Sequence, residues 1–227
     1  MLEQNLQIVR QRIDNALVKA GRVDKVLLVA VTKNHPVEAV QEAAALGVTT
    51  VGENRVQEAK QKIETYEGPV LNWHLIGHLQ VNKIRQAVPL FDLIHSVDSE
   101  RVLDEINRVA AKVGKIQDVL LQVNVAREES KSGMEVEDFP RIRDYAKILP
   151  NVRVRGLMCM APFEEDTEKV RPVFRVASFL YEDMKAYFPA NQICYLSMGM
   201  THDFEVAIEE GANIVRIGTA IFGERVY

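Results

Sequence analysis

One lysine stands where an amine could do covalent chemistry. Lys33 closes the largely apolar run VLLVAVTK at residues 26–33, so its side chain begins at the edge of a dry core. Burial disfavours an ammonium, so the pKa of such an amine falls from about 10.4 and its lone pair can attack a carbonyl. The alternative is a lysine whose stem covers the core while its amine reaches solvent. The first interpretation, a buried amine with a lowered pKa, predicts a Schiff-base lysine.

Glycine and hydroxyl residues gather in two segments near the other end of the chain. They are SMGM at 197–200, followed by Thr201, and RIGTA at 216–220. Glycines let backbone N–H groups approach an anion, and the start of a following helix adds positive potential. Against this, Asp203 and Glu205 disfavour an anion nearby, and glycines also serve turn geometry alone. Together with Lys33, the two segments predict a site for a phosphate-bearing carbonyl compound.

Eight strand-like runs alternate with stretches of helical period, which indicates βαβ units and a parallel sheet. An amphipathic segment at 2–20 precedes the first run. Eight parallel strands with no evident edge strand favour a closed (β/α)₈ TIM barrel over a doubly wound open sheet. We expect one α/β domain over residues 1–227 with an extra N-terminal helix, and a site where the strands end. The runs are 26–33, 49–54, 72–77, 93–98, 118–125, 154–160, 193–199 and 214–223.

Composition excludes several classes of function. Lys and Arg (28) interleave with Asp and Glu (32), without the basic stripe that nucleic acid requires. Apolar runs of about six residues are too short to cross a membrane, and the N-terminus resembles no leader peptide. Two cysteines predict neither a disulfide framework nor a cysteine zinc site. His74 and His78 lie about 13 Å apart along an extended strand, so no metal site is expected. We predict a cytoplasmic protein.

Eight motifs, in order over nearly the whole chain, resemble the YggS/PROSC family of pyridoxal phosphate homeostasis proteins. The resemblance implies a barrel similar to the N-terminal domain of bacterial alanine racemases, known as fold type III. It also implies pyridoxal 5′-phosphate, a vitamin B6 cofactor, bound to Lys33 as a Schiff base. The motifs are AVTKNHP, VGENRVQE, WHLIGHLQVNK, HSVD, QVNVAREESKSGM, RGLMCMAP, LSMGMTHDFEVAI and RIGTAIFGER.

The resemblance further implies how the cofactor is held. Arg216 would face the pyridine nitrogen, which agrees with an inward side chain on the last strand if Val215 and Ile217 point outward. The residues around the phosphate would be Ser197, Gly199, Gly218 and Thr219, and those near the ring Asn54, His78 and Met158. No catalytic residue and no metal ligand is implied.

Three functions fit a Schiff-base lysine beside a phosphate site. The resemblance implies a protein that binds, buffers and delivers pyridoxal phosphate, with PLP-dependent apo-enzymes as recipients. An amino-acid racemase needs a second base opposite the lysine; in the resembled racemases a tyrosine of a C-terminal domain supplies it across a dimer. Because this chain stops at Tyr227, soon after the last strand, we expect a monomer with no more than weak side reactivity toward amino acids. A class I aldolase is disfavoured because its lysine usually lies on a later strand.

Overall fold

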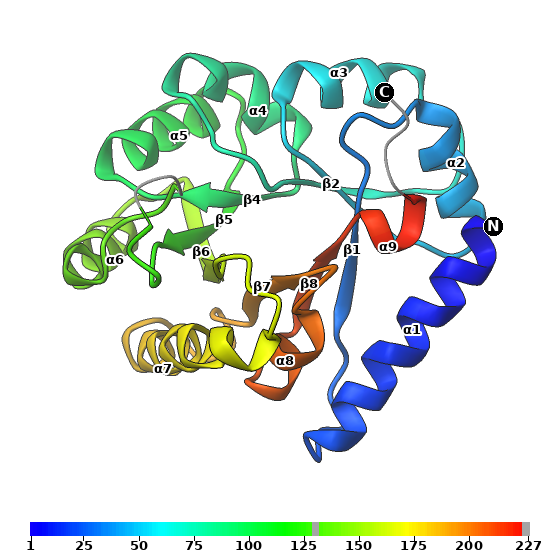
Figure 1. The fold of residues 1–227 in the computed structure, drawn as a ribbon. Coiled ribbons are helices and arrows are strands. Elements are labelled where there is room, and N and C mark those ends of the chain that lie inside the picture. The colour runs from blue at the N-terminus through cyan, green and yellow to red at the C-terminus, as the bar shows by residue number, and fades with distance from the viewer. Residues whose placement is uncertain (129–131, 224–227) are drawn as a thin grey trace.

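Eight parallel strands close into a barrel, which confirms the predicted TIM-barrel fold (Figure 1). The structure is a computed structural model and describes residues 1–128 and 132–223. Each strand pairs with the next along the chain, and β1 pairs with β8, for example Val29 with Arg216, to complete the ring. The strands are β1 (Leu27–Val31), β2 (Thr50–Glu53), β3 (Asn72–Leu75), β4 (Leu93–Val97), β5 (Gln117–Val123), β6 (Val152–Cys159), β7 (Tyr195–Met200) and β8 (Ile214–Ile217).

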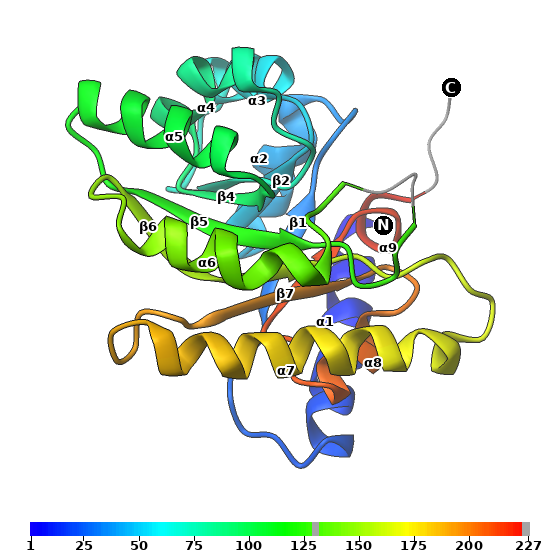
Figure 2. The ribbon, with the colours of Figure 1, turned by 90° about the vertical axis from the view of Figure 1, so that its left-hand side faces the viewer.

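Helices alternate with the strands and cover the outside of the barrel, as the two views in Figures 1 and 2 show. The predicted extra helix α1 precedes the first strand and packs against α8 and α9. The helices are α1 (Leu2–Lys19), α2 (Val37–Ala45), α3 (Val56–Thr65), α4 (Ile84–Leu90), α5 (Glu100–Lys112), α6 (Phe139–Lys147), α7 (Arg171–Tyr187), α8 (Phe204–Glu209) and α9 (Thr219–Phe222), with 3₁₀ turns at Val81–Lys83, Val136–Asp138 and Thr167–Val170.

The last predicted strand was too long. β8 ends at Ile217, and the rest of the apolar run forms the short helix α9. The change occurs at Gly218, whose carbonyl accepts hydrogen bonds from the backbone N–H groups of Ile221 and Phe222. Ile221 is fully buried. An apolar run therefore continued from strand to helix because both elements bury side chains, and periodicity alone could not separate them.

The barrel interior contains an apolar part and a polar part. The apolar part is a cluster of fully or nearly fully buried side chains, joined at its edge by Tyr195. Two residues further along three of the same strands lie His95, Ser197 and Arg216, which are also buried. The interior thus becomes polar toward the carboxyl ends of the strands. The apolar cluster consists of Val29, Leu93, Leu120, Met158 and Ile214.

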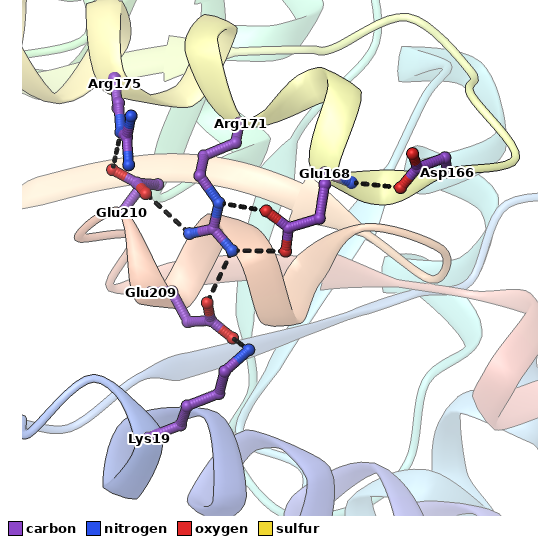
Figure 3. A network of polar contacts seen from close by, with 7 residues as sticks. All are labelled: Lys19, Asp166, Glu168, Arg171, Arg175, Glu209 and Glu210. Carbon is purple, nitrogen blue, oxygen red and sulfur yellow. Dashed lines mark hydrogen bonds and ion pairs between the residues drawn. The ribbon is translucent and has the colours of Figure 1, made fainter.

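A network of ion pairs joins α1, α7 and α8 on the outer surface (Figure 3). At its centre the Arg171 guanidinium contacts Glu168 at 2.6 Å and Glu209 and Glu210 at 2.7 Å each. Lys19 of α1 completes the link to Glu209 at 2.6 Å. We call this set the Arg171 network; it consists of Lys19, Asp166, Glu168, Arg171, Arg175, Glu209 and Glu210.

Candidate functional site

A cavity of about 270 Å³ opens at the carboxyl ends of the strands, the end at which the sequence predicted a site. The ends of β1, β2, β7 and β8 supply most of its polar lining, and Ile76 and Met160 supply apolar surface after β3 and β6. Since loops and strand ends at this face carry the chemistry of TIM barrels, this cavity is the candidate site.

The cavity brings together five of the nine residues that the sequence singled out. Two of them carry the groups on which the predicted chemistry depends, namely the amine of Lys33 and the guanidinium of Arg216. The other four residues do not line it. The five are Lys33, Asn54, Arg216, Gly218 and Thr219, and the four are His78, Met158, Ser197 and Gly199.

Lys33 lies in a tight turn that follows β1. The turn is closed by a hydrogen bond from the His35 N–H to the Thr32 carbonyl at 3.0 Å. Asn34 has a φ of +62°, a conformation that asparagine tolerates better than most residues. The turn leaves Lys33 half-buried on the wall of the cavity. The sequence therefore positions this amine through a strand end and a turn of fixed shape.

Arg216 is fixed inside the barrel by two hydrogen bonds. Its Nη1 donates to Ser197 Oγ at 2.6 Å and its Nη2 to the Cys159 carbonyl at 3.1 Å. The side chain is 3% exposed, and burial lowers the pKa of its guanidinium to about 10. It is still a cation at neutral pH. Its charge is opposed by the buried carboxylate of Asp203 at the start of α8.

A chain of buried polar groups continues from Arg216 across the barrel. His95 Nδ1 lies 3.0 Å from Ser197 Oγ, and His95 Nε2 lies 3.0 Å from His74 Nδ1. Arginine only donates, so the Ser197 hydroxyl accepts from Arg216 and keeps its own proton to donate. In the tautomer of His95 that carries its proton on Nε2, the hydroxyl donates to His95 Nδ1 and His95 donates to His74 Nδ1. In that tautomer the hydrogen bonds run in one direction, away from the cavity.

The two histidines in this series of hydrogen bonds, His74 and His95, are neutral. Burial lowers the pKa of His74 to about 3. Burial, with the charge that His74 would carry if protonated and the charge of Arg216, places the pKa of His95 well below its ordinary value. Because neutral imidazoles bring no charge to Arg216, they orient it without cancelling its positive potential. Ser197, predicted as a phosphate ligand, is a fully buried partner of Arg216 in this structure.

Gly199 has a packing role at the end of β7. Its φ is +93°, and a Cβ there would lie 2.6 Å from the Ala207 Cβ and 2.8 Å from the Phe204 Cα. The glycine therefore lets α8 approach the strand. The cavity is instead lined by the two residues after the strand, Thr201 and His202.

Thr201 joins the two segments that the sequence proposed as an anion cradle. Its Oγ1 accepts from the backbone N–H of Ala220 in α9 at 3.5 Å, and Gly218 and Thr219 line the cavity beside it. The helix that follows this segment, α8, begins three residues after Thr201, at Phe204. The position of Thr201 directly after a glycine-containing strand end was a signal from which the sequence could have identified it as a cavity residue.

His78 and Met158 lie outside the cavity for different reasons. His78 is exposed after β3, and Ile76, two residues earlier, lines the cavity instead. Met158 is fully buried in the apolar cluster, whereas Met160 reaches the cavity. Side chains two apart on a strand share a face, so the residues implied by the resemblance lie two positions away from the residues that reach the cavity.

Two aromatic contacts lie at the rim of the cavity, and neither was predicted from the sequence. The His35 ring lies 4.8 Å from the Phe222 ring, centroid to centroid. The His202 ring stacks on Phe163 at 5.0 Å, and His202 Nε2 lies 2.8 Å from the Glu164 carbonyl. Phe163 is 77% exposed. Both histidines line the cavity.

Within residues 1–128 and 132–223, the chain contains no group of three or more His, Cys, Asp or Glu side chains placed to hold a metal ion. That part of the chain also contains no helix of the length and apolar character needed to cross a membrane. Within it, neither Cys159 nor Cys194 forms a disulfide bond.

The chain is similar to known proteins over its full length. The family model of the alanine racemase N-terminal domain matches residues 2–226. A pyridoxal phosphate homeostasis protein of Aquifex aeolicus is 44% identical over 99% of this chain and 98% of its own. PipY of Synechococcus elongatus, solved with PLP bound, is 35% identical, with a TM-score of 0.82 over 98% of this chain and 100% of its own. Alanine racemase of Clostridium difficile, at 16% identity and a TM-score of 0.70 over 99% of this chain and 58% of its own, shares the fold.

Proposed function

The chain belongs to the alanine racemase N-terminal domain family and, within it, to the pyridoxal phosphate homeostasis proteins, and on that premise we propose that its cavity binds pyridoxal 5′-phosphate through Lys33. We infer that it holds and releases this cofactor and does not turn over a substrate. The recipients would be PLP-dependent apo-enzymes. The proposal includes a single domain over residues 1–227 that works as a monomer in the cytoplasm.

The residues present fit this cofactor, and the charge of the cavity carries the argument. None of the described residues that line the cavity is an aspartate or glutamate, whereas Lys33 and Arg216 both line it. A dianionic phosphate is favoured by such a lining, because hydrogen bonds to charged acceptors are about twice as strong as neutral ones. Thr201, Gly218 and Thr219 offer hydroxyl and backbone donors where two turns meet.

Each part of the cofactor would meet a different element. When bound, PLP supplies an aldehyde that condenses with amines and a pyridine ring that draws electrons from the bond formed. We infer that Lys33, at the end of β1, binds the aldehyde carbon. Arg216 donates to the ring nitrogen, and Asn54 contacts the ring from the end of β2. The other predicted cofactor residues would affect binding only through the residues that line the cavity. They are Ser197, Gly199, His78 and Met158.

Arg216 argues against substantial catalysis. Arginine is a donor only, so its favourable partner is a neutral pyridine nitrogen. A protonated pyridine is the stronger electron sink for carbanion chemistry, and a buried guanidinium disfavours that second positive charge. The cavity thus suits retention of the cofactor more than reaction of a bound amino acid. Thr219 and His202 are exposed at the rim, so the bound cofactor can leave to solvent.

The proposal is tested with the protein loaded with PLP. We expect it to transfer the cofactor to an apo-enzyme and restore that enzyme's activity. With L-alanine or L-serine we expect at most slow exchange at Lys33. Racemisation, decarboxylation or transamination at about 1 s⁻¹ or faster, an ordinary enzyme rate, would overturn the proposal in favour of a racemase-like enzyme.

A further inference from the structure

We propose that Lys62, on the outer helix α3, is a positioning residue for Lys33. It holds the backbone on both sides of Lys33 in the shape that presents the Lys33 amine to an aldehyde. This inference rests on the proposed binding of PLP. Lys62 itself does not line the cavity and lies behind the turn, so it would act through the backbone alone.

The contacts of Lys62 reach the peptide group that precedes Lys33. Lys62 Nζ donates to the Thr32 carbonyl oxygen at 2.7 Å, which belongs to the peptide bond between Thr32 and Lys33. The same nitrogen donates to Glu53 Oε1 at 2.6 Å and to Glu58 Oε1 at 2.8 Å. An ammonium has three protons, so these three acceptors use its full capacity.

The peptide group that follows Lys33 is held by the same cluster. The Asn34 N–H donates to Glu58 Oε1 at 2.5 Å, and Glu58 is bound to Lys62. The Thr32 hydroxyl donates to Glu53 Oε1, also at 2.5 Å. Both peptide planes that flank Lys33 are therefore hydrogen-bonded to one group of side chains. We call Thr32, Glu53, Glu58 and Lys62 the Lys62 cluster.

Burial makes this arrangement rigid. The Lys62 side chain is 8% exposed and the Glu53 side chain is not exposed at all. Among the residues that the structure describes, Glu53 Oε2 has no hydrogen-bond partner, and burial raises the pKa of this carboxyl above its usual value. A buried carboxylate with one unpaired oxygen is costly, so Glu53 depends on Lys62 as its counter-charge.

The test separates positioning of Lys33 from general damage to the site. PLP carries the aldehyde that Lys33 needs, whereas pyridoxine 5′-phosphate carries an alcohol and depends on the ring and phosphate contacts alone. Wild type, Lys62→Met and Glu58→Ala are compared. Lys60→Met is the matched control, because Lys60 is a half-exposed lysine of the same helix that forms an ion pair with the exposed Glu64. Stopped-flow absorbance follows covalent attachment, and calorimetry gives the affinity for pyridoxine phosphate.

We expect Lys62→Met to slow covalent attachment of PLP about 10- to 100-fold, the scale of a small misplacement of a reacting group. Glu58→Ala, which frees only the Asn34 side of the turn, should slow it less. The affinity for pyridoxine phosphate should stay at the wild-type value in both, and Lys60→Met should match wild type with both ligands.

A parallel loss of PLP attachment and of affinity for pyridoxine phosphate would show structural damage and overturn the inference. Attachment of PLP at the wild-type rate in the variants would overturn it as well. If Lys62→Met does not fold, Glu58→Ala decides by the same criterion, because its side chain is 21% exposed and its loss is tolerable. Absence of covalent attachment in wild type overturns the proposed function itself. Attachment in wild type that the variants leave unchanged overturns only the role of Lys62.

Discussion

The Lys62 cluster behind the cavity and the Arg171 network on the outer surface both place one cation among several carboxylates. In the Lys62 cluster the cation is 8% exposed and donates to a backbone carbonyl beside Lys33. In the Arg171 network the partner Glu168 is 59% exposed, and the ion pairs join side chains of α1, α7, the end of α8 and the turn before α7 (Figure 3). The first fixes the shape of one turn, and the second fastens helices together.

This difference shows why the number of ion pairs does not identify a functional network. The Arg171 network has more members, yet water reaches its outer charges on Lys19, Glu168 and Arg175, and none of its members lines the cavity. The Lys62 cluster is smaller, but it cannot be rearranged without leaving buried charges unpaired. The position of the polar partner, on the backbone of the reactive lysine, is what connects it to function.

The largest expected effect concerns Arg216, a buried cation whose hydrogen bonds go to neutral groups in place of carboxylates. Arg216→Glu replaces a donor cation with an acceptor anion beside the ring nitrogen. The pKa of that nitrogen should rise by about 2 to 6 units, since each neighbouring charge shifts a pKa by about 1 to 3. The ¹⁵N resonance of labelled PLP should move to the protonated position and side reactivity toward amino acids should rise. In Arg216→Met the nitrogen should stay unprotonated; an unchanged shift in Arg216→Glu with PLP bound would refute the contact.

Stability measurements compare the two networks directly. Lys62→Met leaves Glu53 buried without its counter-charge and should lower the free energy of unfolding by about 3–5 kcal/mol. Arg171→Met should cost about 1 kcal/mol, because Glu168 is exposed to solvent while Glu209 keeps Lys19 and Glu210 keeps Arg175 as counter-charges. Urea denaturation of both variants and wild type gives the two values. Equal losses would remove the distinction between the networks.

Acid should separate buried from exposed groups by the pH at which stability is lost. The pKa of His74 is about 3 in the folded protein and near 6.5 when unfolded, so the unfolded state takes up the proton first. Stability is therefore full above about pH 6.5 and falls as pH drops toward 3. Between pH 7 and 5 the loss should be about 2 kcal/mol for His74. His95, with a pKa also lowered by burial, adds to it.

The Arg171 network should respond only at lower pH. The hydrogen bond from Arg171 lowers the pKa of Glu168 from its unfolded value of 4.5. The stability that this hydrogen bond contributes is therefore present above pH 4.5 and is lost as the pH falls below it. Urea titrations at pH 7, 6 and 5 check this: His74→Gln should flatten the pH dependence in that window, and Glu168→Gln should leave it unchanged. A slope that persists in His74→Gln at the wild-type size would place the titrating group elsewhere.

Salt should produce the smallest difference. Raising NaCl from 0.1 to 1 M shortens the screening length from about 10 to about 3 Å. The stability difference between wild type and Arg171→Met should then shrink by less than about 1 kcal/mol. The difference between wild type and Lys62→Met should remain, because ions do not reach the cluster. A similar decrease for both variants would mean that the Lys62 cluster is solvated.

Much of this fold and the location of its site follow from local sequence signals. Strand runs that end in Lys33 and in the glycines near 199 and 218 predicted the barrel and the end at which the cavity lies. The family resemblance, not periodicity, supplied Arg216 as a cofactor contact. Alternation correctly placed it inside the barrel, since its side chain lines the cavity and contacts Ser197.

Depth and long-range contacts were not predictable from the sequence. Met158 and Met160 share a strand face, and only the closed barrel decides which of them reaches the cavity. Gly199 looked like an anion ligand because its need to admit α8 depends on how that helix packs. Lys62 lies 29 positions after Lys33, in a charged helix where any lysine would be read as a solvated residue. Its role depends on a contact that only the folded chain brings about.

Everything proposed for the cavity depends on Lys33 as the residue that holds pyridoxal phosphate. The most direct measurement loads the purified protein with PLP, reduces it with borohydride and locates the phosphopyridoxyl group by peptide mass spectrometry. We expect one modified residue, Lys33, in stoichiometric yield, and loss of both the adduct and the yellow absorbance in Lys33→Ala. A stoichiometric adduct on any other lysine, or one that survives in Lys33→Ala, would contradict it.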